Sequence, residues 1–576
     1  EGALNVYRRE VYPQQWAETS ASLCRTLMRM AETPEDWRHL SNVADDLIET
    51  VHAFALAGTN RAQQRSLLRT LQGMGDLAAF AHIRLGEPHR AFETLTLARA
   101  VGSDLAFRLA SGNRDDNALP DSEPFRRWQS LQIAVERQLR ESLDQAGKAQ
   151  PVGAERLEEL RAAYQELMTS LKASGALERE RMDVAAFAQA LSPSSAAALI
   201  FVSEQGGGIL IVTPGATAIP ASAMIELPQL TSGRLGALLN GEGEKAGGWL
   251  AAYERYRKES SSWDEAAVER AVTTWNSEIE ALLPQLWDLV MGPLAAWLER
   301  EAPELDAVHL MAPVLMSMLP LHAARPAQSD APYFAERWAV SYLPSPRALM
   351  ARPALSRHEE PSLLAITDPA GDIGADVNPA WPFFAAPHRR TVQGRAADVA
   401  AALVGAGDVS HVSFFCHGIW EGSDPDLSHL VMADGSQLSA QDLAAIDLRS
   451  VDLALLGACE TALIGTRGTP DEFTGLPVAL LQAGVRSVAA SQWLVDAAST
   501  YALLHRMTQE HRAGLSPARA LQAAQRAFVA GEMDTIEELL GGSAVLSRLR
   551  TLRPLSAPGF DAKTQTGLRA DQSLPP

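Results

Sequence analysis

The spacing of hydrophobic residues in the first third of the chain is typical of helices. Leu23, Leu27 and Met30 are spaced as neighbours on one helix face. A longer face of the same kind extends over four turns and contains Leu157, Leu160, Tyr164, Leu167 and Leu171. Thr33-Pro34-Glu35-Asp36 has the residues of a helix start, with Thr33 as the N-cap. We therefore expect the chain to be helical as far as about residue 190.

A weak repeat is visible within this helical part. Pro13-x-x-Trp16 and Pro34-x-x-Trp37 begin 21 residues apart, which is the length of one helix and its turn in arrays of stacked helical pairs. Two copies are equally compatible with an ordinary helical bundle.

Near Pro193 the pattern changes from helical to strand-like. Ala198–Ser203 and Gly208–Thr213 are separated by Glu204–Gly207, which predicts a hairpin. The glycine run at 206–208 is followed by no helix start, so it fits a turn better than a phosphate-binding loop. A stretch with helical patterning follows at Ala266–Arg300.

Short apolar runs then alternate with helical segments. The predicted strands are Val308–Ala312, Ala339–Leu343, Leu363–Thr367, Val412–Cys416, Leu453–Gly457 and Val485–Ala490. Apolar runs without alternation suit strands that are buried on both faces, and helices between them imply parallel crossovers. The sequence therefore predicts an all-α region followed by an α/β domain with a mostly parallel sheet.

Composition and charge narrow the classes of partner. The chain has 576 residues with 50 Lys and Arg against 70 Asp and Glu, a net charge of −20. Direct binding of nucleic acid is not expected, because phosphate binding depends on Lys and Arg. The basic cluster of His388, Arg389, Arg390 and Arg395 is expected on a solvated loop.

Cysteine content and hydropathy indicate the compartment. Cys24, Cys416 and Cys459 are too few for a disulfide framework, which suits a reducing compartment such as the cytoplasm. No apolar run approaches the roughly 20 residues of a membrane-spanning helix, so no membrane is expected as a partner. The chain opens without Met and without a signal-type segment, and we expect it to be a fragment.

Two predicted strands end in residues that could carry chemistry. Val412–Cys416 is followed by His417-Gly418, and Leu453–Gly457 is followed by Ala458-Cys459. Functional groups gather at the carboxyl ends of strands in open α/β sheets. If the strands are neighbours, the imidazole can take the thiol proton, and the thiolate can attack a carbonyl carbon. The N–H groups of Gly418 and Cys459 could then receive the oxyanion.

Structural roles for the same residues remain open. A cysteine at a strand end is often a small buried hydrophobe, as we expect for Cys416, and a histidine is often only hydrogen-bonded. Rival chemistries lack their parts, since the chain has no HExxH, paired CxxC, G-x-S-x-G or P-loop motif.

From Val412 to about Ala530 the sequence resembles a CHAT domain, the caspase-like peptidase domain attached to TPR arrays. The matching segments are Phe415-Cys416-His417-Gly418, Leu456-Gly457-Ala458-Cys459-Glu460-Thr461-Ala462, Asp471-Glu472-Phe473-Thr474-Gly475-Leu476-Pro477, Leu481–Val488 and Ser491–Asp496. Weaker likeness lies upstream in Leu286–Leu289, Pro320-Leu321-His322 and Tyr342–Ser345, and the helical part is similar to the end of a TPR array.

The resemblance implies a division of the chain. Residues 1–120 would be TPR-like helical repeats, 121–190 linking helices, 191–545 the CHAT caspase-like domain and 546–576 a mobile tail.

The resemblance also implies an activity. His417 would be the general base and Cys459 the nucleophile of a cysteine endopeptidase that needs no metal or cofactor. Their separation of 42 residues is close to the roughly 50 of caspase signatures. Such enzymes cleave a specific protein, often in bacterial defence or regulated cell death, and are latent until a protein partner binds the helical array. The alternative is a non-catalytic scaffold with a peptidase-like domain.

The specificity pocket departs from the family pattern. Related peptidases that cut after basic residues resemble Trp-x-Val-x-Asp, whereas Ala497 stands here in place of the last Asp. A methyl group cannot pair with Arg or Lys, which favours an uncharged residue before the scissile bond. Asp496 could restore a basic preference, or simply bind local backbone N–H groups. Trp493 is expected either as a pocket wall or as a core aromatic.

Overall fold

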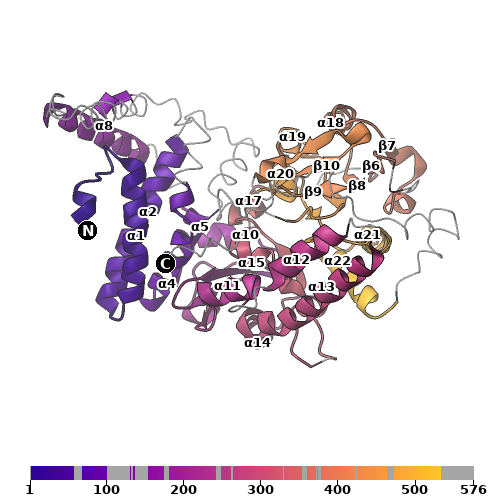
Figure 1. Cartoon of the computed structure of the whole chain (residues 1–576), viewed down its shortest axis with the longest axis horizontal. Coiled ribbons are helices and arrows are strands. Elements are labelled where there is room, and N and C mark those ends of the chain that lie inside the picture. Colours follow the sequence, from indigo (N-terminus) through magenta and orange to yellow (C-terminus); the bar gives the residue numbers. More distant parts are fainter. Residues whose placement is uncertain are drawn as a thin grey trace.

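The chain folds into a helical region followed by an α/β region that contains two five-stranded sheets (Figure 1). This computed structural model describes residues 2–57, 68–99, 127, 130–131, 134–135, 154–173, 181–241, 248–260, 264–328, 330–352, 360–371, 373, 378–421, 424–463 and 473–532. The predicted tail at 546–576 and half of the predicted linking segment at 121–190 lie outside these residues.

The helical region begins as the sequence predicts. Its helices are η1 (Gly2–Asn5), α1 (Pro13–Met30), α2 (Pro34–Ala57), α4 (Met74–Arg84), α5 (Pro88–Ala98), α8 (Ala154–Ala173) and α10 (Val184–Ala190). Both Pro-x-x-Trp copies start a helix, and Trp16 and Trp37 are buried. Thr33 caps α2, because its hydroxyl accepts a hydrogen bond from the Asp36 N–H at 3.3 Å.

The buried face of α1 differs from the predicted one. Met30 is 70% exposed, and the side chains that face the core are Trp16, Ala17, Ser20, Ala21, Cys24 and Met28. The small residues among them let α1 approach α2 closely, which outweighs the burial of the larger Leu23 and Leu27 at the edge of that face.

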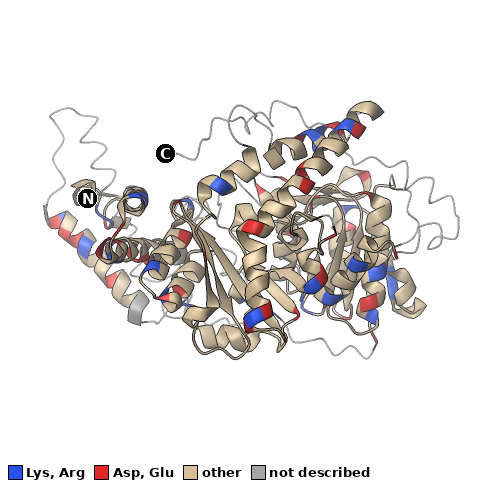
Figure 2. Cartoon of the chain, turned by 90° about the horizontal axis from the view of Figure 1, so that it is seen from below, with Lys and Arg blue, Asp and Glu red and all other residues tan. Residues whose placement is uncertain are grey.

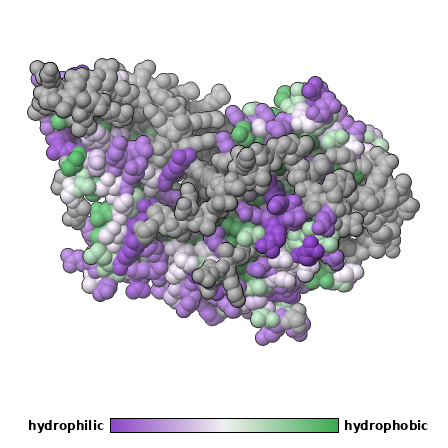
Figure 3. Space-filling view, viewed as in Figure 1, coloured by the Kyte–Doolittle hydropathy of each residue, from purple (hydrophilic) through white to green (hydrophobic). Residues whose placement is uncertain are grey.

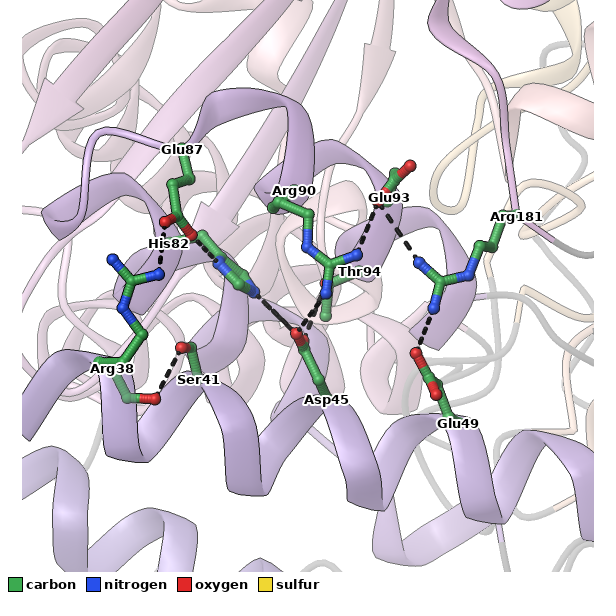
Figure 4. A network of polar contacts seen from close by, with 10 residues as sticks. All are labelled: Arg38, Ser41, Asp45, Glu49, His82, Glu87, Arg90, Glu93, Thr94 and Arg181. Atoms are coloured by element: carbon green, nitrogen blue, oxygen red, sulfur yellow. Dashed lines mark hydrogen bonds and ion pairs between the residues drawn. The ribbon is translucent and has the colours of Figure 1, made fainter. Parts of the chain in front are cut away.

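Polar contacts fasten α2, α4 and α5 to one another (Figure 4). The buried His82 lies between two carboxylates, with Nε2 3.2 Å from Asp45 and Nδ1 3.0 Å from Glu87. Arg90 also pairs with Asp45, at 3.1 Å. Arg181, just before α10, pairs with Glu49 of α2 and with Glu93 of α5, so the network extends toward the α/β region.

The first sheet is mixed. Its strands are β1 (Ser195–Val202), β2 (Gly207–Val212), β3 (Met224–Leu227), β4 (Ala307–Met311) and β5 (Ala339–Tyr342), in the order β3-β2-β1-β4-β5. β1, β4 and β5 are parallel, whereas β2 is antiparallel to both β1 and β3. The predicted hairpin is confirmed, with Ser203 N–H donating to the Gly206 carbonyl at 2.7 Å.

Long helices follow β3 before β4 is reached. They are α11 (Ser232–Asn240), α12 (Gly248–Glu259), α13 (Glu265–Leu286), the π-helical turn η4 (Trp287–Met291) and α14 (Gly292–Glu301). The predicted helical stretch at Ala266–Arg300 therefore exists, broken by one π-helical turn. Short elements surround β5: α15 (Val314–Ser317), η5 (Leu321–Ala323), α16 (Phe334–Arg337) and α17 (Pro346–Met350).

The second sheet is wholly parallel. Its strands are β6 (Leu363–Thr367), β7 (Arg389–Val392), β8 (His411–Phe415), β12 (Leu453–Gly457) and β13 (Val488–Ala489), in the order β13-β12-β8-β6-β7. The predicted loop around Arg389 and Arg390 is wrong, because these residues open the edge strand β7. In Figure 2 the strands are drawn almost wholly in tan and the charged residues of both signs lie mainly on helices.

Smaller elements complete the second half. They are η6 (Trp381–Phe383), η7 (Ala386–His388), α18 (Ala396–Val404), β9 (Gly418–Ile419), η8 (Pro425–Leu427), β10 (His429–Val431), η9 (Ala433–Gly435), β11 (Gln437–Ser439), α19 (Ala440–Ala444), α20 (Leu476–Gln482), α21 (Ala497–Arg512) and α22 (Pro517–Val529). β9, β10 and β11 form a separate antiparallel sheet. The observed architecture, helices followed by an α/β region with mostly parallel strands, is the one that the sequence predicts.

Two sets of polar contacts join these parts. Arg99, after α5, pairs with the buried Asp76 of α4 at 2.5 Å and donates to the carbonyl of Ile200 in β1 at 2.6 Å. At the other end of the chain, Arg519 of α22 pairs with Asp306 at the start of β4, at 2.5 Å. The helical region and the last helix are thus both tied to the first sheet.

On the face seen in Figure 3, the green apolar side chains of the described residues are scattered among purple polar ones. Among the described residues one stretch, Ala266–Glu301, is long and apolar enough to cross a membrane, and half of the apolar 18-residue window within it is buried inside the protein. A core helix meets the same criteria, so this stretch is weak evidence for a membrane span.

Candidate functional site

The register of the second sheet brings the two predicted catalytic residues to the same edge. β8 and β12 are neighbours and parallel, and Phe415 lies opposite Gly457 at their carboxyl ends. His417 and Cys459 each lie two residues beyond this last pair. Both side chains are half-buried, whereas their neighbours Cys416, Gly418, Ala458 and Glu460 are buried. Cys416 is therefore a core residue, as expected.

Gly418 lies directly against the turn that carries Cys459. A Cβ at this position would be 2.5 Å from the carbonyl oxygen of Cys459 and 3.2 Å from the Cβ of Ala458. Only glycine fits here, because a backbone atom cannot move aside as a side-chain end can. Gly418 thus allows the segment after the histidine to pack on the segment that carries the thiol.

Gly457, two residues before Cys459, is needed for the packing of the sheet and not for the approach of a substrate. An added Cβ would meet Phe415 at 2.8 Å and Leu504 of α21 at 2.9 Å. The glycine is therefore needed for packing of β12 between β8 and α21. It is enclosed by protein and does not leave room for a substrate.

The surroundings of the Cys459 thiol favour its neutral form. The sulfur lies 3.7 Å from the carbonyl oxygen of Val495, to which the S–H can donate. Burial raises the pKa of the Cys459 thiol to about 11, and the carboxylates of Glu460 and Asp496 add to the rise. A thiol with this pKa is protonated at neutral pH in this arrangement.

The turn that follows Cys459 has an unusual backbone. Glu460 has φ of 56°, in the left-handed region that costs a non-glycine residue roughly 1–2 kcal/mol. Its N–H donates to the Trp493 carbonyl at 3.2 Å, and its own carbonyl accepts from Leu463 N–H at 3.2 Å. Thr461 and Ser491 then both donate their hydroxyls to the Ala458 carbonyl, which closes the turn.

Helix α12 supplies site residues that the sequence analysis missed. The Tyr253 hydroxyl donates to Glu460 Oε1 at 2.6 Å, and Arg257 Nε lies 2.9 Å from the same oxygen. Burial raises the pKa of Tyr256 to about 12, with the Cys459 and Asp496 charges adding to the rise. Trp249, Tyr253 and Tyr256 have helical spacing, and this aromatic stripe was the signal available in the sequence.

The predicted specificity residues lie close to the thiol but differ in surroundings. Trp493 is half-buried and meets Trp275 of α13 edge to face, with ring centroids 5.8 Å apart. Asp496 is exposed and caps α21, its carboxylate accepting from Ser499 N–H at 2.7 Å. Ala497 is the first residue of that helix and is half-buried. Of the two roles open to Asp496, binding of local backbone N–H groups is the one observed.

Metal chemistry has no site among the residues described. No group of three or more His, Cys, Asp or Glu side chains in this part of the chain could hold a metal ion. The N–H groups of Gly418 and Cys459 remain the predicted oxyanion donors.

These features define a class of protein: an α/β domain with a histidine and a cysteine after neighbouring parallel strands. Residues 280–538 match the family model of the CHAT domain. The resemblance noted in the sequence is therefore confirmed over these residues.

Comparison with individual proteins adds little detail. No curated protein matches the chain. Among solved structures, the Saccharomyces cerevisiae separase–securin complex is similar, with 11% sequence identity and a TM-score of 0.46. The match covers 85% of this chain and 37% of that chain.

Proposed function

We propose that this protein is a cysteine endopeptidase with Cys459 as nucleophile and His417 as general base. The observation that carries the proposal is the register of β8 and β12, in which the two residues occupy equivalent positions beyond adjacent strand ends. The close packing of Gly418 on the Cys459 carbonyl supports it, because it leaves no side chain between the two segments.

The reaction would use only groups of this chain. His417 takes the thiol proton, and the Cys459 sulfur attacks the peptide carbonyl carbon. The N–H groups of Gly418 and Cys459 stabilise the oxyanion that develops. The protonated histidine gives its proton to the leaving amine, and a thioacyl intermediate remains. Water, deprotonated by His417, then hydrolyses the thioester and releases the thiol.

The resting protein would be latent. With the pKa of the Cys459 thiol at about 11, only about one molecule in 10,000 would hold the free thiolate at pH 7. An activating protein partner that binds the helical region would shift the population toward a competent arrangement. We place this enzyme in the cytoplasm, with a specific protein substrate and a role in bacterial defence or regulated cell death.

The substrate would have an uncharged residue before the scissile bond. Ala497 offers a methyl group in place of the family's acidic residue, and the Asp496 carboxylate already caps α21. A lysine or arginine would thus lack a dedicated partner.

Alkylation of the individual cysteines by iodoacetamide, followed by mass spectrometry, tests the catalytic assignment. We expect Cys459 to react faster than the buried Cys24 and Cys416, and His417→Ala to slow Cys459 alone. His388→Ala, which removes an exposed histidine paired with Glu360, is the matched control and should change nothing. If His417→Ala leaves the Cys459 rate unchanged, the dyad does not operate.

A non-catalytic scaffold is the second candidate, and the neutral thiol is the observation that favours it. It predicts equal Cys459 rates in the wild type and in His417→Ala, with and without any partner.

A further inference from the structure

The strained residue after the nucleophile is held by an unusual set of contacts. Its carboxylate is buried and accepts hydrogen bonds from Tyr253 and Arg257, both of α12. The backbone N–H of Trp420 also stabilises the charged form of Glu460. Trp420 lies three residues after His417, immediately beyond β9.

Three segments therefore meet at one carboxylate. One carries the nucleophile, one follows the general base, and one is a helix more than 200 positions earlier in the chain. Arg257 also reaches the carbonyl of Trp420 at 3.5 Å and lies over its indole ring, 5.9 Å from the centroid. Arg257 thus contacts both catalytic segments.

We propose that Glu460 is a positioning residue that joins the Cys459 turn to the His417 segment through Tyr253 and Arg257, and that its ion pair with Arg257 sets the charge beside the thiol. The inference rests on the proposed peptidase function, because it concerns the placement of the nucleophile. It makes α12 part of the catalytic apparatus, although no residue of α12 takes part in a bond-breaking step.

The chemistry of the site explains why the arginine is needed. A carboxylate beside a nucleophilic thiol opposes formation of the thiolate, so an unpaired Glu460 would work against catalysis. Arg257 supplies the compensating charge at 2.9 Å. The other ionisable groups that face the thiol or Glu460 are Asp496, Tyr253, Tyr256 and Glu421.

An aromatic cluster holds α12 in place. Trp249 and Tyr253 of α12 pack on Trp275 of α13, with ring centroids 5.3 and 5.0 Å away. Trp275 in turn meets Trp493, whose carbonyl accepts the Glu460 N–H. A movement of α12 would therefore be transmitted to Glu460 in two ways. One is the Glu460 carboxylate, which contacts α12, and the other is the Glu460 backbone N–H, which binds the Trp493 carbonyl.

The test is a double-mutant cycle read out as the alkylation rate of Cys459 at pH 8.5. Glu460→Gln keeps the shape and removes the negative charge, whereas Arg257→Met keeps most of the volume and removes the positive charge. A shift of one unit in the thiol pKa changes the thiolate fraction tenfold. Because a thiolate of lower pKa is also a weaker nucleophile, part of the tenfold change is offset, which leaves about a threefold change in the alkylation rate.

We expect Glu460→Gln to raise the rate about three- to tenfold and Arg257→Met to lower it by a similar factor. The double variant should return to within about threefold of the wild type. Arg390→Met breaks an exposed ion pair between Arg390 of β7 and Asp408, and it should leave the alkylation rate of Cys459 unchanged. Rates that rise in both single variants, or change in neither, would overturn the inference.

Two further measurements keep the outcomes distinct. If charge causes the changes in rate, a bulky maleimide should give the same variant-to-wild-type ratios of Cys459 alkylation as iodoacetamide. If the variants instead widen the access to the thiol, the ratios should be larger for the bulky reagent. Labelling of the buried Cys24 would reveal that a variant has unfolded. Tyr253→Phe, which removes one oxygen, then takes the place of the unfolded variant and should lower the alkylation rate of Cys459 about twofold. If His417→Ala does not slow the alkylation of Cys459 while the Glu460 and Arg257 variants give the expected rates, the proposed function is contradicted and the inference about Glu460 is not.

Discussion

At the scale of single residues, the thiol is the group whose state decides whether the site can act. Cys459 is surrounded by a carbonyl, two carboxylates and two tyrosines, and none of these stabilises a thiolate by charge. Burial and negative neighbours act in the same direction here, which distinguishes this cysteine from one beside a permanently charged cation.

The pH dependence of alkylation follows from the raised pKa. Because the Cys459 pKa is about 11, its rate should rise about tenfold per pH unit from pH 7 to 9 without reaching a plateau. The thiol also holds its proton more tightly in the folded state, so its contribution to stability is complete below pH 9 and falls as pH rises toward 11. A rate that levels off near pH 8 would show a more acidic thiol.

Replacement of Gly418 tests the contact between the two catalytic segments. The alanine Cβ would lie 2.5 Å from the Cys459 carbonyl, so the turn must shift. Gly418→Ala should cost about 1–3 kcal/mol of unfolding free energy in urea and alter Cys459 alkylation. Gly407→Ala has open space around its Cβ and should leave both unchanged, which makes it the control.

At the scale of elements, α21 connects helix stability to the site. Asp496 is both the N-cap of this helix and a negative charge near the thiol. Asp496→Ala should cost about 1 kcal/mol of stability and raise the alkylation rate of Cys459. Asp496→Asn keeps a good cap, so it should raise the rate with a change in stability of only a few tenths of a kcal/mol. Equal destabilisation by both variants would contradict the capping role.

The sequence predicts most elements because their patterns are local. Leu363–Thr367 and Leu453–Gly457 match β6 and β12 residue for residue, since uninterrupted apolar runs have few other solutions. β7 was missed because an exposed edge strand that begins with two arginines lacks that pattern. The placement of His417 and Cys459 near each other is predictable for the same reason, as each lies two residues beyond a buried strand.

The part of the site that escaped prediction depends on distant contacts. Tyr253 and Glu460 are 207 positions apart, and no spacing rule connects them. The left-handed φ of Glu460 is equally invisible in sequence, because glutamate gives no sign of it as a glycine would. Local sequence patterns thus predict the position of Cys459 but not the residues that hold its turn in place.

At the scale of the whole molecule, the helical region is fixed to the α/β region by a buried ion pair. Arg99 and Asp76 are 6% and 7% exposed, and both bind the backbone of β1, at Ile200 and Val202. Arg99 also donates to the Met311 carbonyl at the end of β4. A signal received by the helices would therefore reach the first sheet without passing through a flexible joint.

Loss of Arg99 should affect both regions together. Arg99→Met leaves Asp76 buried without its partner and should cost about 3–5 kcal/mol in urea unfolding. Hydrogen exchange should show lost protection in α4, α5 and the ends of β1 and β4 at once. Arg161→Met breaks an exposed pair with Glu158 and should cost less than about 1 kcal/mol. Loss of protection confined to the helices would show that the ion pair does not couple the regions.

The last described helix packs on both sheets at once. Ala520 and Ala524 of α22 lie in one core with Leu363 and Leu453 of the second sheet. On the other side, Arg519 pairs with Asp306, and Gln522 donates to the Ala335 carbonyl beside the first sheet. α22 begins about 175 residues after β5 ends.

This order of elements bears on how the protein folds during its synthesis. On a ribosome that adds about 5–20 residues per second, the first sheet would wait roughly 10–35 s for the helix that completes its cover. The Cys459 thiol emerges before that helix does, so a nascent chain carries the thiol while the halves of the domain are still unjoined. If Cys459 acts as proposed, the site would stay incomplete until α22 has been translated.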